Sequence, residues 1–200
     1  MTTLEESSAT RHAAARRAMI DSQLRTSGVN QPWVLNAMAS VAREQFVPDA
    51  MRDAAYIDRA ITLADGRQLA SPLVHGRMLA EAAPTQDDKA LLVGDGKGYL
   101  AALLRPLVDS LDAVAPDAAA AKRGKGAYTL LMVDGAVEEM PGSFAKLLAE
   151  GGRVVTGVLE GGVTRLAVGT RTGGDIALLP IADLGIPVLP EFRAPKRWSF

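Results

Sequence analysis

The sequence of 200 residues contains no cysteine and only two histidines, His12 and His75. Without cysteine the chain can form no disulfide, use no thiolate nucleophile and hold no cysteine-ligated zinc. Two histidines with no spaced carboxylate cluster beside them predict no metal site. Lys and Arg (22) balance Asp and Glu (23) to a net charge of −1. The charge pattern therefore favours neither nucleic acid nor an anionic membrane as a partner.

Long hydrophobic runs are missing as well. No apolar stretch approaches the roughly 18 residues that a membrane span needs. Residues 1–8 carry Glu5 and Glu6 and lack the apolar core of a signal peptide, so we expect a cytoplasmic protein. With 48% hydrophobic residues, the chain is long and apolar enough to form one soluble α/β domain over residues 1–200.

Three glycines alternate within residues 89–100, KALLVGDGKGYL. The apolar run before the first glycine predicts a buried parallel strand, and residues 100–107 predict a helix. A glycine-rich turn between a strand and a helix N-terminus can cradle a nucleotide-type ligand, because backbone N–H groups approach it closely. The same pattern also fits a tight turn that binds nothing. The candidate ligand-binding residues here are Gly94, Asp95, Gly96, Gly98 and Tyr99.

Hydrophobic spacing predicts the remaining elements. Helices over residues 13–24, 31–42 and 49–55 form an N-terminal helical cap region, residues 1–75, ahead of a sheet core, residues 76–200. A second buried strand over residues 128–133 ends at Asp134, which we interpret either as a ligand contact at the carboxyl edge of the sheet or as a cap. Further along, we expect a helix ending at the C-cap pair Gly151–Gly152, a strand over residues 153–158, and a hairpin around residues 172–174.

Several ordered segments surround the glycine loop: residues 19–25 (MIDSQLR), 34–38 (VLNAM), 43–48 (REQFVP), 55–56 (AY), 65–72 (DGRQLASP) with His75, and 132–141 (MVDGAVEEMP). In order and spacing they resemble protein-L-isoaspartate O-methyltransferases, and the resemblance extends over about residues 19–200. It implies a single-domain S-adenosylmethionine-methyltransferase-like, Rossmann-like α/β fold. The sheet would be doubly wound and mostly parallel, with a C-terminal antiparallel hairpin.

The resemblance also implies a reaction. A methyl group would pass from S-adenosylmethionine to an isoaspartyl carboxylate of a damaged protein, which is an in-line displacement that needs positioning and water exclusion but no metal or activated nucleophile. Such a protein would hold the cofactor at the glycine loop and Asp134. Its substrates would be isoaspartyl-containing proteins or peptides.

The cofactor region departs from the family pattern. The family usually has an acidic residue two positions before the first glycine, where this chain has Leu92, and a ribose-binding acid at the end of the next strand, where it has Ala115. Only about thirty residues separate Gly94 from the strand that begins at Tyr128. We therefore expect that one strand–helix unit of the family is missing around residues 115–127, which leaves residues 111–115 as an edge strand.

The substrate clamp differs too. Aligned on Pro72, the family's clamp serine falls at Ala70, and the hydroxyl has moved to Ser71. We name Ser71 and His75 as the candidate catalytic residues, with a packing or capping role as the alternative for His75.

Two functions remain open. The chain is either a working methyltransferase with an unusual cofactor grip, or a non-catalytic relative that binds no cofactor. The non-catalytic relative would act by protein binding or self-association through the exposed sheet edge. The aromatic residues of the tail, Phe192, Trp198 and Phe200, are expected to seal the core.

Overall fold

The computed structural model describes residues 2–194, with side chains from residue 8 onward. The chain forms two compact units, Met1–Ala80 and Glu81–Phe200, and each is described by itself. Whether they act as the single domain expected from the sequence stays a prediction, as does the role of the N-terminal helices as a cap.

The first unit is mainly helical. Pro32 occupies the first turn of α2, where its missing N–H costs nothing. Gly76 on α3 allows close packing, because a Cβ there would lie 3.2 Å from Leu24 Cδ2 and 3.3 Å from Met38 Sδ. The elements are α1 (Thr2–Met19), η1 (Ile20–Leu24), η2 (Arg25–Ser27), α2 (Pro32–Ser40), η3 (Arg43–Phe46), η4 (Asp49–Ala54), an antiparallel pair β1 (Ile61–Thr62) and β2 (Gln68–Leu69), and α3 (Pro72–Ala82). The predicted helices are present, although the third is a 3₁₀ helix and α1 begins well before residue 13.

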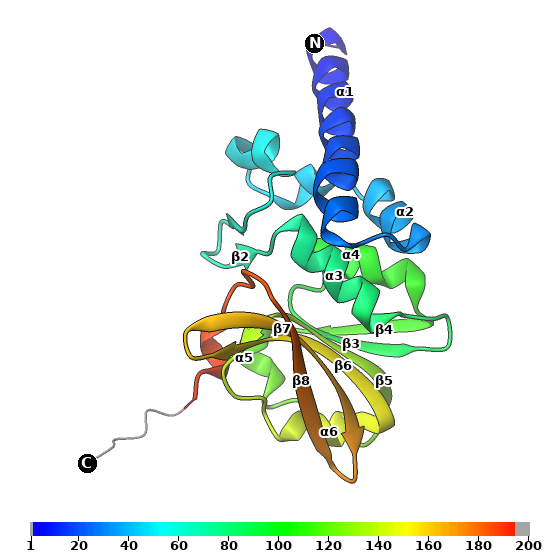
Figure 1. Cartoon of the computed structure of the whole chain (residues 1–200), viewed down its shortest axis with the longest axis vertical. Coiled ribbons are helices and arrows are strands. Elements are labelled where there is room, and N and C mark those ends of the chain that lie inside the picture. Colours follow the sequence, from blue (N-terminus) through cyan, green and yellow to red (C-terminus); the bar gives the residue numbers. More distant parts are fainter. Residues whose placement is uncertain (1, 195–200) are drawn as a thin grey trace, which may run out of the picture. The chain divides into compact units, whose positions relative to one another are not determined.

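The second unit alternates strands and short helices around one sheet (Figure 1). Its elements are β3 (Lys89–Val93), α4 (Tyr99–Leu104), η5 (Arg105–Leu107), β4 (Ser110–Val114), α5 (Pro116–Ala119), β5 (Tyr128–Val137), α6 (Ser143–Leu147), β6 (Leu148–Glu160), β7 (Val163–Thr172), β8 (Asp175–Asp183) and η6 (Pro190–Phe192).

Within residues 2–194 the six strands of this sheet have the order β4-β3-β5-β6-β7-β8. The pairs β4–β3, β3–β5 and β5–β6 are parallel, whereas β6–β7 and β7–β8 are antiparallel. The parallel strands β3 and β5 are buried apolar runs, as expected for strands covered on both faces. The predicted fold class, a mostly parallel sheet that ends in an antiparallel hairpin, is confirmed.

One face of the sheet is sealed by α5, α6 and the segment after β8. Leu91 and Leu131 on this face join a core cluster with Phe144 and Leu147 of α6. Phe192 packs edge-on against Phe144, with ring centroids 5.8 Å apart. The predicted core role is therefore confirmed for Phe192, while Trp198 and Phe200 lie outside the described residues.

The start of β3 is fixed by a buried carboxylate. Asp88 accepts hydrogen bonds from the Thr129 hydroxyl (2.7 Å), the Thr85 N–H (2.8 Å) and the Arg153 guanidinium (2.7 Å). Burial opposes ionisation of Asp88, but these donors together hold the pKa of its carboxyl below the ordinary value. Asp88 thus ties β3, β5 and β6 together at their amino ends.

The predicted C-cap pair Gly151–Gly152 is wrong. Helix α6 already ends at Leu147, and strand β6 starts directly afterwards. Tyr128 pairs with Leu148 and Leu130 with Arg153, so β6 carries three extra residues between these two pairs. The glycines lie in this bulge, where Gly151 has a φ of +75° that favours glycine.

Candidate functional site

The glycine loop lies at a topological switch point of the sheet. From β3 the chain moves to β4 on one side and then to β5 on the other, so the carboxyl ends of β3 and β5 border the crevice where open α/β sheets bind ligands. Gly94 follows β3, and Asp134 directly follows Val133, the last residue of β5 that pairs with β3. A Cβ built on Gly94 would be 3.0 Å from the Asp134 Cβ, which places the two predicted residues side by side.

The loop itself is held by its own hydrogen bonds. Gly94 N–H donates to the Val114 carbonyl (2.9 Å), while Lys97 N–H donates to Asp95 Oδ1 (2.8 Å) and Gly98 N–H to the Asp95 carbonyl (3.0 Å). Asp95 therefore stabilises a tight turn through its side chain and backbone.

Close packing also explains one of the glycines. A Cβ on Gly96 would come within 2.8 Å of the Ala113 Cβ, a distance that real side chains do not adopt. The Gly96 carbonyl accepts a hydrogen bond of 3.1 Å from Arg105. Glycine at position 96 is thus required by packing against β4, whether or not a ligand binds.

Tyr99 and Leu92 are both buried in the second unit. Tyr99 is the first residue of α4 and has no exposed surface. Leu92 also has no exposed surface, and it lies on the Gly94 side of β3, 3.6 Å from a Cβ built on that glycine. An apolar side chain therefore lies beneath the loop where the family pattern places an acid.

Ala115 is exposed and directly follows β4, at the N-cap of α5. Its methyl group offers no hydrogen bond to a ribose, and Asp117 lies in the first turn of the short helix. The position where a ribose-binding acid is expected is therefore open to solvent and lacks the acid.

Ser71 and His75 belong to the first unit, and the structure gives each a local partner. Ser71 is the residue before α3, and its Oγ accepts the Val74 N–H at 3.5 Å, the arrangement of a helix N-cap. His75 has no exposed surface and lies one turn into the helix, where Nδ1 is 3.3 Å from Arg43 Nη1. Catalytic roles for Ser71 and His75 stay predictions.

Arg43 is the residue of this region that sequence reasoning did not single out. It is buried, and it donates to the carbonyl oxygens of Ala55 (2.7 Å) and Ala70 (2.6 Å) as well as to His75. It thereby fixes the segment that carries Ser71. A buried arginine leaves no periodic signal in a sequence, so only its place in the 43–48 motif pointed to it.

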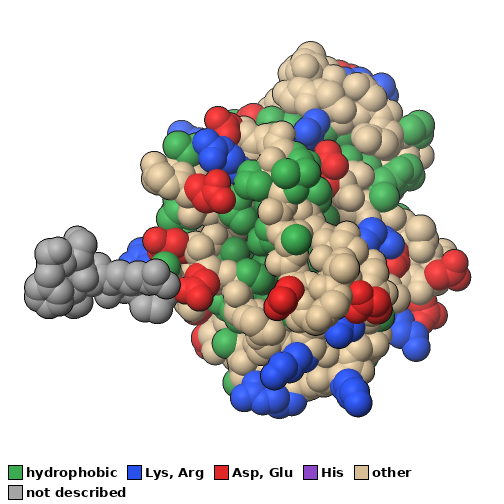
Figure 2. Space-filling model, turned by 60° about the horizontal axis from the view of Figure 1, so that its bottom comes forward, with side chains coloured by type: hydrophobic (Ala, Val, Ile, Leu, Met, Phe, Trp, Pro, Cys, Tyr) green, Lys and Arg blue, Asp and Glu red, His purple; other side chains and the backbone are tan. Residues whose placement is uncertain are grey.

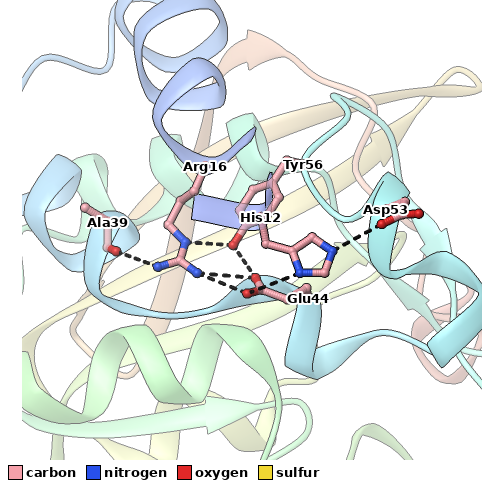
Figure 3. A network of polar contacts seen from close by, with 6 residues as sticks. All are labelled: His12, Arg16, Ala39, Glu44, Asp53 and Tyr56. Atoms are coloured by element: carbon pink, nitrogen blue, oxygen red, sulfur yellow. Dashed lines mark hydrogen bonds and ion pairs between the residues drawn. The ribbon is translucent and has the colours of Figure 1, made fainter. Parts of the chain in front are cut away.

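A second polar network fastens α1 to the 3₁₀ turns of the first unit (Figure 3). Arg16 donates to the Tyr56 hydroxyl (2.7 Å), to Glu44 (3.2 Å) and to the Ala39 carbonyl (3.0 Å), while Tyr56 donates to Glu44. His12 Nε2 lies 3.3 Å from Asp53 Oδ1. Burial and the hydrogen bond to Glu44 raise the pKa of Tyr56 to about 12.

The basic and acidic side chains of this network face one another, with His12 and Arg16 beside Glu44 and Asp53. Burial opposes ionisation of Glu44, but the hydrogen bond from Tyr56 and the charge of Arg16 hold the pKa of its carboxyl below the ordinary value. Since the charged groups satisfy one another, we assign the network to folding of the first unit.

Two negative findings apply to residues 2–194. No group of three or more His, Cys, Asp or Glu side chains is arranged to hold a metal ion there. In the same residues, no helix has both the length and the apolar character needed to cross a bilayer.

The sheet order, with the glycine loop beside Asp134 at the switch point, is that of a Rossmann-like α/β protein. A family model for protein-L-isoaspartate(D-aspartate) O-methyltransferase matches residues 14–115. Protein-L-isoaspartate O-methyltransferase 1 of Rhodopseudomonas palustris (strain HaA2) is 31% identical over 225 residues, covering 94% of this chain and 92% of the relative. The chain therefore belongs to the protein-L-isoaspartate O-methyltransferase family.

Other relatives agree. Protein-L-isoaspartate O-methyltransferase of Koribacter versatilis (strain Ellin345) is 30% identical over 196 residues, which cover 86% of this chain and 88% of that protein. A crystal structure from Plasmodium falciparum, described provisionally as the same kind of enzyme and solved with S-adenosyl-L-homocysteine, has a TM-score of 0.69. It is 17% identical and covers 90% of this chain and 98% of its own. At that identity the structural match supports the fold alone.

Proposed function

We propose that this protein transfers a methyl group from S-adenosylmethionine to the side-chain carboxylate of isoaspartyl residues in damaged proteins, and that it does so in the cytoplasm. The observation that carries the proposal is the contact between Gly94 and Asp134 at the switch point between β3 and β5, in a chain of this family. Ligands of open α/β sheets bind at that place.

The residues at the crevice fit such a cofactor in part. Glycine at position 94 leaves room for Asp134, since a Cβ there would lie 3.0 Å from the Asp134 Cβ, and α4 begins directly after the loop. The residues proposed to hold the cofactor are Gly94, Asp95, Gly96, Gly98, Tyr99 and Asp134. The ribose of the cofactor lacks an acidic partner at these positions, since Leu92 and Ala115 have no carboxylate.

When bound, S-adenosylmethionine supplies an electrophilic methyl group. The chain's own task is then to orient the carboxylate and exclude water, which needs neither a metal nor a covalent intermediate. The Ser71 hydroxyl is the group proposed to contact the substrate, and Arg43 positions the backbone that carries it. His75 is proposed to support this segment from α3.

The test is a pair of measurements on the full chain. Isothermal titration with S-adenosylmethionine measures cofactor binding, and transfer of labelled methyl groups to an isoaspartyl peptide measures catalysis. The proposal predicts both binding and a methyl ester on the isoaspartyl peptide, with none on the aspartyl peptide of the same sequence. Absence of transfer at saturating cofactor would overturn it and favour the non-catalytic relative.

A further inference from the structure

A cavity of about 290 Å³ opens on the second unit between α6 and the loop after α5. Three of its lining side chains are cations, Lys122, Arg123 and Lys146, and Ser143 adds a hydroxyl. We call this cavity the basic pocket. It is separate from the glycine loop and uses none of the residues proposed to bind the cofactor.

The three cations of the basic pocket form no ion pair within the described residues, although Lys122 lies over the ring of Tyr128, whose hydroxyl donates to the Asp112 carboxylate. Among the described residues no carboxylate oxygen lies within 4.0 Å of any of them, whereas Arg153, Arg165 and Arg171 of the same unit each form an ion pair. Like charges gathered around one cavity raise its positive potential. On one face of the molecule, Lys and Arg side chains also gather along one edge (Figure 2).

The loop that carries two of the cations is held in place. Gly126 N–H donates to the Lys146 carbonyl (2.8 Å), and Ala127 N–H donates to the Leu147 carbonyl (2.9 Å). The Ser143 hydroxyl donates to the Ala120 carbonyl (3.3 Å), which joins the start of α6 to the start of the loop. The basic pocket is therefore preorganised, so the binding of a ligand does not include the free-energy cost of ordering this loop.

Two of the cations are also oriented. Arg123 Nη1 donates to the Ala120 carbonyl at 3.2 Å, and the Lys122 ammonium lies 5.6 Å from the centre of the Tyr128 ring. Neither contact neutralises the positive charge. The first contact keeps Arg123 beside Ala120, which lines the basic pocket.

The basic pocket lies far from the cofactor crevice along the sheet. Its loop leads directly into Tyr128 at the amino end of β5, while Asp134 comes six residues later, directly after the last pair of that strand with β3. Six residues of extended strand span roughly 20 Å. A ligand in the basic pocket is thus distinct from a cofactor at the glycine loop.

We propose that the basic pocket binds a small phosphorylated molecule that carries at least two negative charges. A single carboxylate offers one charge and two oxygen atoms, which would leave two of the three positive charges uncompensated. A phosphate group offers more acceptor oxygens, and the planar guanidinium of Arg123 matches them in pairs. The volume lies near the lower limit for small-molecule sites, which favours a diphosphate or a phosphorylated sugar over a large cofactor.

The test is titration of the full chain with inorganic pyrophosphate, followed by backbone amide NMR and calorimetry. We expect saturable shifts at Gly124 and Ser143, with none at Gly94 or Gly96. The double variant Arg123→Ala/Lys146→Ala should weaken binding about 25-fold, or about fivefold for each exposed cation removed. Arg123→Lys keeps the positive charge and should retain most of the affinity that Arg123→Ala loses.

Lys125 provides the matched control, because it is an exposed cation of the same loop that does not line the basic pocket. Lys125→Ala should change the affinity less than about twofold. ADP serves as a second probe: equal affinity means that only the phosphates are bound, and tighter binding means that the attached group is bound too. The proposal is overturned if about 10 mM pyrophosphate leaves Gly124 and Ser143 unshifted, or if Lys125→Ala weakens binding as much as Arg123→Ala.

Discussion

The guanidinium of Arg43 lies 3.3 Å from Nδ1 of His75, and neither side chain has exposed surface. Arginine has donors but no acceptor, so Nδ1 accepts this hydrogen bond and the ring carries its proton on Nε2. The same guanidinium donates to the carbonyl oxygens of Ala55 and Ala70. His75 is thus part of a buried arrangement that joins three segments of the first unit.

His75→Ala is expected to destabilise the protein, because it deprives a buried guanidinium of an acceptor. We expect the free energy of unfolding to fall by about 2–3 kcal/mol, measured by urea denaturation. The exposed Gln45 offers a control, since Gln45→Ala should cost less than about 0.5 kcal/mol. A His75→Ala protein of unchanged stability that has lost methyl transfer would instead assign His75 to catalysis.

Ser71 combines a structural and a proposed functional hydroxyl. Ser71→Ala removes the N-cap of α3 and should lower the free energy of unfolding by about 0.5–1 kcal/mol, which leaves the protein folded at room temperature. If the hydroxyl also contacts the substrate, this variant loses methyl transfer to the isoaspartyl peptide, while Ser71→Thr keeps both the cap and measurable transfer. Transfer that survives Ser71→Ala would refute the proposed role.

The affinity for S-adenosylmethionine should be low. A well-placed hydrogen bond to a charged group contributes about 1.5–3 kcal/mol, a tenfold to hundredfold effect for each contact. Leu92 and Ala115 stand where the resemblance predicts two cofactor-binding acids, so we expect a dissociation constant in the high micromolar range or above in calorimetry. Binding at low micromolar or tighter concentrations would show that other groups hold the ribose.

Restoring an acid tests the same idea directly. Ala115 is exposed, so Ala115→Glu should tighten cofactor binding about tenfold with little change in stability. Leu92 is fully buried, so Leu92→Asp should destabilise the fold through an unpaired buried carboxylate. The exposed Asp117 gives a charge control. Asp117→Asn should leave the affinity for the cofactor unchanged, which would show that this nearby acid does not replace the missing one.

The sequence predicts the order of the elements better than their local irregularities. The apolar runs of β3 and β5 and the hairpin of β7 and β8 were found because periodicity and glycine turns report them directly. The bulge at Gly151 cannot be distinguished from a helix end in the sequence, since a glycine pair occurs in both. Contacts across long separations, such as Arg43 to Ala70 or Asp88 to Arg153, leave no pattern in the chain and required the structure.

The bonds to Asp88 predict a pH dependence of stability. The pKa of this carboxyl is held below its ordinary value in the folded state. Its contribution to the free energy of unfolding is therefore fully present above the unfolded pKa of about 4, and it is lost as the pH falls through the folded pKa. Asp88→Asn should lower the free energy of unfolding by about 2–3 kcal/mol at pH 7, with the difference from the parent shrinking below about pH 4. Urea denaturation at several pH values measures it.

The exposed Asp87 beside it is the control for this experiment. Asp87→Asn should leave both the stability at pH 7 and its pH dependence nearly unchanged, because that carboxylate makes no ion pair among the described residues. A difference between Asp88→Asn and the parent that stays constant from pH 7 to pH 3 would contradict the assignment.

The outer strand β4 is the expected place of self-association. Within residues 2–194 its one neighbour in the sheet is β3, and the loop before β5 is bonded to α6. Asp109 and Asp112 discourage pairing by their charge, while Leu111, Ala113 and Val114 leave the strand apolar enough to pair with a second copy. We therefore expect light scattering at high concentration to report about twice the 21.0 kDa of one chain.

The backbone of β4 allows a sharp test of this edge. The Val114 carbonyl accepts a hydrogen bond from the Gly94 N–H and therefore points toward β3. Backbone groups alternate in direction along a strand, so the N–H of Asp112 also points toward β3, whereas the N–H of Ala113 points away from it. Ala113→Pro removes an outward donor and should dissociate the dimer while the fold survives. Asp112→Pro is the matched control, since it removes a donor to β3 and should lower stability instead. A protein that is monomeric at every concentration, or a dimer that persists in Ala113→Pro, would exclude β4 as the interface.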